Sequence, residues 1–257
     1  MPTGPALPAA FLAAPLAHRA LHDRAQGRPE NSRAAIRAAI AAGYGIEIDL
    51  QLSADRQAMV FHDEGLERLT AATGWVKDRS AAELGAIALR DSDEGIPTLA
   101  EVLAIVAGRV PLLIEVKDQM LTPGGRIGPL EQATVAALRG YAGPVALMSF
   151  NPDAVAELAR LAPDLPRGLT TGSFDPVEYA PLPPDLCARL REIPDYARVG
   201  AGFISHEAAD LNRARVLALK AAGARILCWT ITSPEAEARA RRVAENITFE
   251  GYQAPRT

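Results

Sequence analysis

The chain has 257 residues, 49% of them hydrophobic, which is enough to bury the core of one barrel-sized domain. Its net charge of −4 and the lack of a basic run long enough to follow a row of phosphates argue against nucleic acid as the main partner. The two cysteines, Cys187 and Cys228, are far apart and in unlike contexts. The sequence therefore predicts neither a disulfide scaffold nor a zinc or redox motif.

The opening segment, Met1 to Ala17, is apolar and uncharged. It lacks the basic start of a secretory signal, and no apolar run in the chain approaches the roughly 18 residues that cross a bilayer. We therefore expect a cytoplasmic protein without stable membrane insertion.

Short apolar runs then alternate with amphipathic, alanine-rich segments. In chain order we predict strand Pro15–His18, helix Asn31–Ala42, strand Ile46–Leu50, an extended piece Ala58–Phe61, helix Thr98–Ala107, strand Pro111–Lys117, helix Leu130–Arg139, strand Val145–Phe150, helix Pro152–Leu161, strand Arg167–Thr170, helix Pro184–Glu192, strand Gly202–Ser205, helix Ala209–Ala222, strand Arg225–Ile231, helix Pro234–Ala244 and strand Ile247–Glu250. About eight strands separated mostly by helices predict a parallel sheet with right-handed crossovers. In a chain of this length they favour an α/β fold of the closed (β/α)8 TIM-barrel type.

Two stretches of the sequence depart from a regular (β/α)8 barrel. The stretch 51–97 is too long for one strand-to-helix connection, and we interpret it as an insertion that carries His62 over the barrel mouth. After the last strand only residues 252–257 remain, so the last helix is expected to be reduced or missing. We expect the segment Leu7 to Leu12 to cover the exposed flank, with a second subunit of a homo-oligomer as the alternative. No composition shift divides residues 1–257 into two domains.

Charged side chains, three of them acidic, occupy alternate positions in two of the predicted strands. Glu47 and Asp49 share one strand face, and Glu115 and Lys117 share another. Buried carboxylates need compensating charge, and a divalent cation with oxygen ligands supplies it. Two simpler interpretations stay open, namely that the first pair lies on a wet edge strand and that the second is a plain ion pair.

Two histidines follow strand-like runs and have charged neighbours. His18 precedes Arg19, and His62 precedes Asp63. Imidazole suits proton transfer near neutral pH, so this set of acids and bases predicts metal-assisted chemistry on a phosphate. His22 and His206 are expected in loops or in supporting positions. The sequence has no nucleotide-binding loop and no G-x-S-x-G elbow.

The ordered motifs of the chain resemble those of the glycerophosphodiester phosphodiesterase family. They are A-H-R (17–19), P-E-N-S (29–32), E-I-D (47–49), F-H-D (61–63), I-P-T-L-A-E-V-L (96–103), I-E-V-K (114–117), W-T (229–230) and F-E-G-Y (249–252). The resemblance runs from about Leu16 to Tyr252. It implies a TIM barrel with a small insertion after the second strand, and a small-molecule substrate, a glycerophosphodiester. The expected reaction is hydrolysis to glycerol 3-phosphate and an alcohol, with one divalent cation, Mg²⁺ or Ca²⁺.

The same resemblance assigns expected roles to individual residues. It implies that His18 and His62 are the catalytic pair, that Glu47, Asp49 and Glu115 are metal ligands, and that Arg19 and Lys117 contact the phosphate. Glu30 and Asn31 match the loop before the first helix. Trp229 is expected to line the core or the pocket and is grouped with the substrate contacts. The family usually has glycine after the His-Arg pair, whereas this chain has Ala20.

For the mechanism we expect His18 to act as the base and His62 as the acid, although sequence order alone does not fix these roles. Two alternatives use the same site. One is a phosphodiesterase that cleaves lysophospholipids, and the other is a catalytically silent barrel that binds a phosphodiester.

Overall fold

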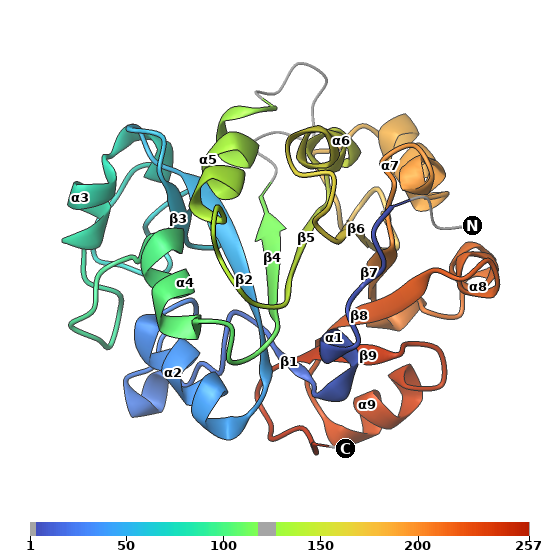
Figure 1. The fold of residues 1–257 in the computed structure, drawn as a ribbon, viewed down its shortest axis with the longest axis horizontal. Helices are drawn as coiled ribbons and strands as arrows, with labels where there is room; N and C mark the ends of the chain where they lie inside the picture. Colours follow the sequence, from blue (N-terminus) through green and yellow to red (C-terminus); the bar gives the residue numbers. More distant parts are fainter. Residues whose placement is uncertain (1–3, 118–126, 257) are drawn as a thin grey trace.

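Eight parallel strands close into a barrel in the computed structural model, which describes residues 4–117 and 127–256 (Figure 1). The barrel strands are β1 (Leu16–Ala17), β2 (Gly45–Leu52), β4 (Leu112–Val116), β5 (Val145–Ser149), β6 (Arg167–Thr171), β7 (Phe203–Glu207), β8 (Arg225–Ile231) and β9 (Asn246–Phe249). Strand β1 pairs in parallel with both β2 and β9, and these pairings close the sheet. The predicted TIM barrel is confirmed.

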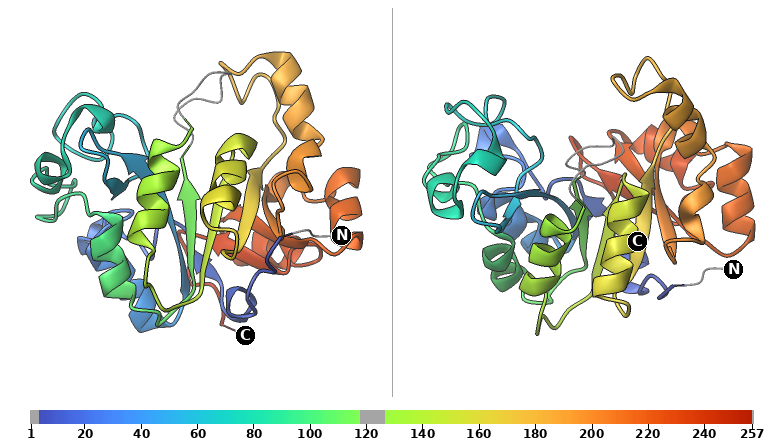
Figure 2. Two further views of the ribbon diagram at one scale, coloured as in Figure 1. Left: turned by 45° about the horizontal axis from the view of Figure 1, so that its top comes forward. Right: turned by 90° about the horizontal axis from the view of Figure 1, so that it is seen from above.

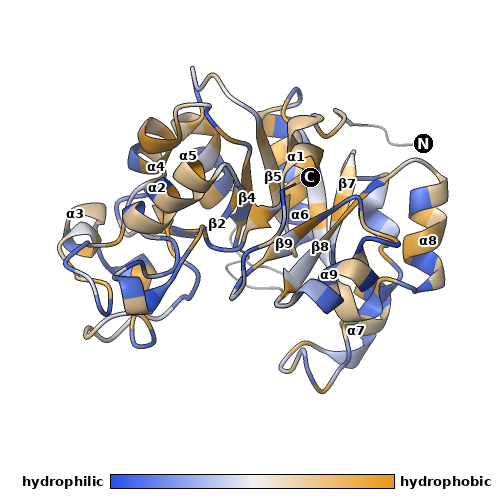
Figure 3. Cartoon of the chain, turned by 90° about the horizontal axis from the view of Figure 1, so that it is seen from below, coloured by the Kyte–Doolittle hydropathy of each residue, from blue (hydrophilic) through white to orange (hydrophobic). Residues whose placement is uncertain are grey.

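Helices connect most of the strands and lie on the outside of the barrel (Figures 1 and 2). They are α2 (Arg33–Ala42), α4 (Leu99–Val106), α5 (Pro129–Ala137), α6 (Pro152–Leu161), α7 (Pro184–Arg191), α8 (Ala214–Ala221) and α9 (Pro234–Ala240). Figure 3 shows both hydrophobic and hydrophilic residues on α8, as expected for a helix with one face on a sheet. Within the described residues, no helix has the length and apolar character to cross a membrane.

Side-chain caps explain several of the helix boundaries. Ser32 caps α2 and Thr98 caps α4, in the latter case within a capping box that includes Glu101. The predicted helix 209–222 is shorter than expected, because residues 208–210 form a separate 3₁₀ turn before α8 begins. In this turn the Asp210 carboxylate contacts Arg213, which stabilises the irregular backbone ahead of the helix.

The predicted insertion is a small compact unit between β2 and α4. It contains β3 (Ala58–Val60), which pairs antiparallel with the end of β2, and α3 (Ala81–Gly85). Its apolar side chains form a cluster of their own, made of Met59, Phe61, Leu66, Leu69, Val76, Leu84, Leu89 and Ile96. This unit folds around its own core, and β3 delivers His62 to the mouth of the barrel.

The N-terminal segment fills the bottom of the barrel interior. Helix α1 (Ala10–Ala13) buries Phe11 completely, in one cluster with Leu7, Leu16, Leu113, Ala146, Met148, Phe203 and Leu227. Leu113 lies two positions before Glu115, on the inward face of β4. Asn246 holds the segment in place, because its Nδ2 donates to the carbonyl oxygens of Phe11 and Ala14, each at 2.7 Å.

The prediction that this segment covers the outer flank between β9 and β1 is therefore wrong. No helix follows β9 in the described residues, and the C-terminal tail covers this flank. The Tyr44 hydroxyl donates to the carbonyl oxygen of Ala254 at 2.6 Å, and the ring of Tyr252 packs 5.6 Å from that of Phe249. Phe11 packs in the barrel interior, where it is completely buried among apolar side chains.

Candidate active site

The predicted site residues meet in one cavity at the carboxyl end of the barrel strands. The cavity has a volume of about 100 Å³, and its lining includes all eight of them, His18, Arg19, Glu47, Asp49, His62, Glu115, Lys117 and Trp229. In a closed parallel barrel the carboxyl ends of the strands gather at one rim, so residues far apart in sequence converge there.

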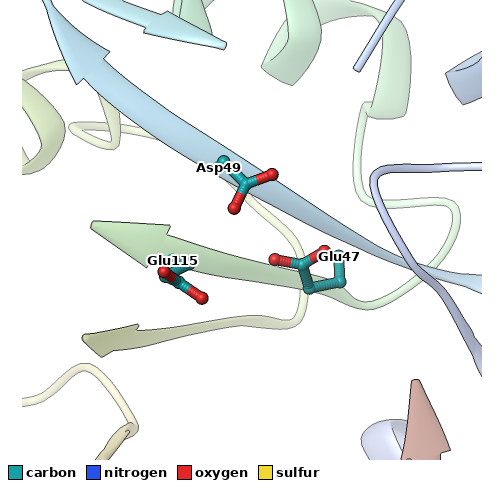
Figure 4. A group of neighbouring side chains, drawn as sticks. All are labelled: Glu47, Asp49 and Glu115. Atoms are coloured by element: carbon teal, nitrogen blue, oxygen red, sulfur yellow. The ribbon is translucent and has the colours of Figure 1, made fainter. Parts of the chain in front are cut away.

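Three carboxylates, drawn in Figure 4, line this cavity together. Glu47 and Asp49 come from β2 and Glu115 from β4, and the strand register places Asp49 opposite Glu115. All three residues are buried, and one carboxylate oxygen of each lies within 4.8 Å of the others. The wet-edge interpretation of Glu47 and Asp49 is wrong, because β2 is paired on both sides and faces the closed barrel interior.

Only part of this negative charge is compensated by protein groups. Lys117 Nζ lies 2.8 Å from Asp49 Oδ1 and 2.6 Å from Glu115 Oε1. Although burial opposes ionisation on both sides, this contact keeps the pKa of Asp49 below and that of Lys117 above their usual values. Burial and the two neighbouring carboxylates instead raise the pKa of Glu47 well above its usual value. Burial and repulsion thus disfavour the ionised form of Glu47 in this cluster.

The loop after β1 supports the cluster from one side. The Arg19 backbone N–H donates to Glu47 Oε2 at 3.0 Å, and Asn31 Nδ2 donates to Asp49 Oδ2 at 3.0 Å. Arg19, Ala20 and Asn31 all have positive φ angles, of 51°, 65° and 59°. Ala20 thus occupies a conformation that glycine adopts more readily, which explains why a family-type glycine suits this position.

Each candidate catalytic histidine is held by a carboxylate at Nδ1. His18 Nδ1 lies 2.6 Å from Oε2 of Glu250, and His62 Nδ1 lies 2.6 Å from Oδ1 of Asp63. An ionised carboxylate only accepts hydrogen bonds, so Nδ1 is the donor, and in the neutral ring Nε2 is the acceptor nitrogen. Hydrogen bonds from His18 and His22 lower the pKa of Glu250, which keeps it ionised.

Neither Glu250 nor Asp63 has a role predicted from the sequence. Asp63 is adjacent to His62, and Glu250 lies in the F-E-G-Y motif, so both stood within motifs already noted. His22 is a second partner of Glu250, at 3.4 Å from Nε2. His206 lies apart from the cavity lining, between Thr171 and Asp210, as expected for a supporting residue.

Trp229 forms part of an apolar wall of the cavity. Its indole Nε1 donates to the carbonyl oxygen of Ser205 at 3.0 Å, and its ring packs edge-on against Phe150 with the ring centroids 5.5 Å apart. Phe150 lines the same cavity. The lining thus combines aromatic rings with charged side chains, so the cavity can accept a molecule with a charged part and a less polar part.

The carboxylate cluster fits a divalent cation. Three buried carboxylates offer oxygen donors of the kind that Mg²⁺ and Ca²⁺ prefer, and a cation beside them would offset the burial and repulsion that raise the pKa of Glu47. Among the described residues this is the one group of three or more acidic, histidine or cysteine side chains close enough to hold an ion together.

Comparison with known proteins identifies the family. The family model "Glycerophosphoryl diester phosphodiesterase family" matches residues 18–246. A glycerophosphodiester phosphodiesterase of Caldanaerobacter subterraneus is 34% identical over 152 residues, which are 55% of this chain and 60% of that protein. One from Bacillus subtilis is 30% identical over 179 residues, 61% of this chain and 57% of that protein. The chain thus spans about three fifths of the length of these two relatives.

Solved structures share the fold at lower identity. A phosphodiesterase of Oleispira antarctica, determined in complex with the product sn-glycerol-3-phosphate, has a TM-score of 0.74 at 23% identity and covers 94% of both chains. A glycerophosphodiester phosphodiesterase of Thermotoga maritima has a TM-score of 0.68 at 21% identity, over 92% of this chain and 94% of that one. With the family model matched along most of its length, the chain belongs to the glycerophosphoryl diester phosphodiesterase family.

Proposed function

We propose that this protein hydrolyses glycerophosphodiesters to glycerol 3-phosphate and an alcohol, with a divalent cation and two histidines. One observation carries the proposal. Three buried carboxylates and two carboxylate-bound histidines line a single cavity, together with two cationic side chains. Family membership and the relatives named for this activity support the same conclusion.

The cationic groups of the cavity suit the phosphate of the substrate. Lys117 and Arg19 supply positive charge beside the carboxylates, and Arg19 also donates to Glu30 at 2.9 Å, which orients its guanidinium. Such groups stabilise the negative charge that develops on the phosphoryl oxygens. A cation bound by Glu47, Asp49 and Glu115 would supply further Lewis-acid charge at a phosphoryl oxygen.

The two histidines divide the proton transfers between them. The neutral His18 ring, with its proton on Nδ1, accepts the proton of the glycerol 2-hydroxyl at Nε2, and that oxygen attacks phosphorus. Protonated His62 donates its Nε2 proton to the oxygen of the departing alcohol. Water then gives a proton to the neutral His62 and attacks the phosphorus of the resulting cyclic phosphate. The bond from phosphorus to the 2-oxygen breaks, that oxygen takes the proton back from His18, and glycerol 3-phosphate is formed. The carboxylates of Glu250 and Asp63 stabilise the protonated form of each ring.

The deciding experiment measures release of glycerol 3-phosphate from a panel of glycerophosphodiesters, with and without a chelator, and with Mg²⁺ or Ca²⁺ restored. His18→Ala and His62→Ala should each lower turnover by about 10²–10⁴-fold, the usual contribution of acid–base catalysis. A p-nitrophenyl ester needs little protonation of its leaving group, so it should partly rescue His62→Ala. Rescue of His18→Ala in its place would reverse the two roles, and release of no glycerol 3-phosphate from any substrate would overturn the proposal.

A further inference from the structure

Arg68, in the insertion, binds two carboxylates at once. Its Nη1 and Nη2 donate to the two oxygens of Glu30, each at 2.8 Å. Its Nε donates to Asp63 Oδ2 at 2.6 Å, and Nη2 also donates to Asp63 Oδ1 at 2.8 Å. A planar guanidinium that forms paired contacts on two sides fixes both carboxylates in position as well as supplying charge.

Each of these carboxylates also holds a residue of the candidate active site. Glu30 accepts from Arg19 Nη1 at 2.9 Å, and Asp63 accepts from His62 Nδ1 at 2.6 Å. The contacts therefore run without a break from Arg19 through Glu30, Arg68 and Asp63 to His62. They connect the loop after β1 with the insertion, two parts of the chain that meet at the cavity.

The charge states of Glu30 and Asp63 help to hold the contacts along this path in place. Burial alone would raise the pKa of Glu30 and Asp63, but hydrogen bonds and positive charge lower both, with Arg68 acting on each of them. Both carboxylates thus stay ionised and act as acceptors. Without Arg68, the Asp63 carboxylate would lose its two guanidinium contacts and gain freedom to rotate away from His62.

We propose that Arg68 is a positioning residue, which sets the orientation of the His62 imidazole through Asp63 and that of the Arg19 guanidinium through Glu30. This inference rests on the proposed function, because His62 and Arg19 are its acid and its phosphate contact. We expect the insertion to fold without Arg68, since it has its own buried cluster, which includes Phe61 and Leu66.

The chain offers a matched control. Arg24 and Asp91 form another ion pair between the same two parts of the chain, with Arg24 Nε 2.8 Å from Asp91 Oδ2. Both side chains are exposed, and neither lines the cavity. Arg24→Gln removes a charged link between the loop and the insertion without touching a site carboxylate.

The test compares Arg68→Gln, Arg68→Lys and Arg24→Gln with the wild type by NMR of the histidine rings and by kinetics. The chain has only four histidines, so each ring can be assigned with a His→Gln variant. We expect Arg68→Gln to change the ring-nitrogen signals and tautomer balance of His62 and leave those of buried His206 unaltered. We expect kcat to fall on the order of 10–100-fold, as for other partners that orient catalytic groups. Arg68→Lys should be intermediate, and Arg24→Gln should match the wild type.

Added guanidinium should restore part of the activity of Arg68→Ala, an effect that a general loss of folding would not show. Unchanged His62 signals together with unchanged kcat in Arg68→Gln would overturn the positioning role. If the wild type hydrolysed no glycerophosphodiester, the proposed function would fail, and the His62 signals of Arg68→Gln would still decide whether Arg68 orients that ring.

Discussion

His18 and Glu250 form a hydrogen bond of 2.6 Å although 232 positions separate them in the sequence. His18 follows β1 and Glu250 follows β9, which are paired neighbours because the barrel closes between its first and last strands. The orientation of one candidate catalytic ring therefore depends on the closure of the whole sheet. Closure also explains why a carboxylate from the end of the chain can support a histidine near its beginning.

We predict that Glu250→Gln lowers turnover on the order of 10–100-fold and leaves the fold intact. The amide oxygen can still accept a hydrogen bond from His18 Nδ1, but it no longer stabilises a protonated ring with a full negative charge. Steady-state kinetics with a glycerophosphodiester substrate checks this, with circular dichroism as the measure of folding. His22→Ala removes the weaker partner of Glu250 and should have a smaller effect. Wild-type turnover in Glu250→Gln would show that the carboxylate charge plays no part.

A second prediction concerns the carboxylate cluster. Because Glu47, Asp49 and Glu115 repel one another, a cation that binds only the folded state should raise the melting temperature in a concentration-dependent way. Glu47→Gln removes one ligand charge at nearly constant volume and should reduce this rise while making the metal-free protein more stable. Thermal unfolding with a series of Mg²⁺ and Ca²⁺ concentrations measures both effects. An equal metal-dependent rise in Glu47→Gln would place the cation elsewhere.

The sequence alone was enough to predict the barrel and the clustering of Glu47, Asp49 and Glu115. Glu47 and Asp49 on β2 are two positions apart, as are Glu115 on β4 and Lys117 just after it, so each pair shares a face by strand geometry alone. The path through Arg68 was not predictable in this way, because Glu30, Asp63 and Arg68 meet only once the insertion folds over the loop after β1. The location of Phe11 was also missed, since a short apolar segment can cover the outside of a barrel or fill its interior equally well by composition.

The pH dependence of stability provides a third prediction, on Glu30. Its pKa is lowered in the folded protein, where the cationic contacts of Arg68 and Arg19 outweigh its burial. A lowered folded-state pKa contributes stability above the unfolded value, near 4.5, and this contribution is lost as the pH falls through the folded value. The stability difference between wild type and Glu30→Gln should thus be largest near neutral pH and shrink below about pH 4.5.

Urea unfolding at a series of pH values measures this difference for Glu30. The exposed Glu64, in the insertion, offers a control, because among the described residues it forms no ion pair with Arg19 or Arg68. A difference for Glu30→Gln that grew as the pH fell would contradict the assigned role of its two arginine partners.

The final prediction concerns the N-terminal plug of the barrel. Phe11 is completely buried among inward-facing residues of several strands, including Leu113. Among the described residues, this cluster has one other aromatic ring, that of Phe203. Phe11→Ala should therefore leave a cavity and lower the free energy of unfolding by about 3–5 kcal/mol, as measured for buried phenylalanines elsewhere.

Leu12→Ala, at a partly buried neighbour, is the control and should lower the free energy of unfolding clearly less. Urea unfolding compares the two variants. Phe11 itself does not line the active-site cavity, and Met148 is the one member of its cluster that does, so turnover of the folded Phe11→Ala protein should stay close to that of the wild type. A loss of less than about 1 kcal/mol would show that α1 is not needed to fill the barrel interior.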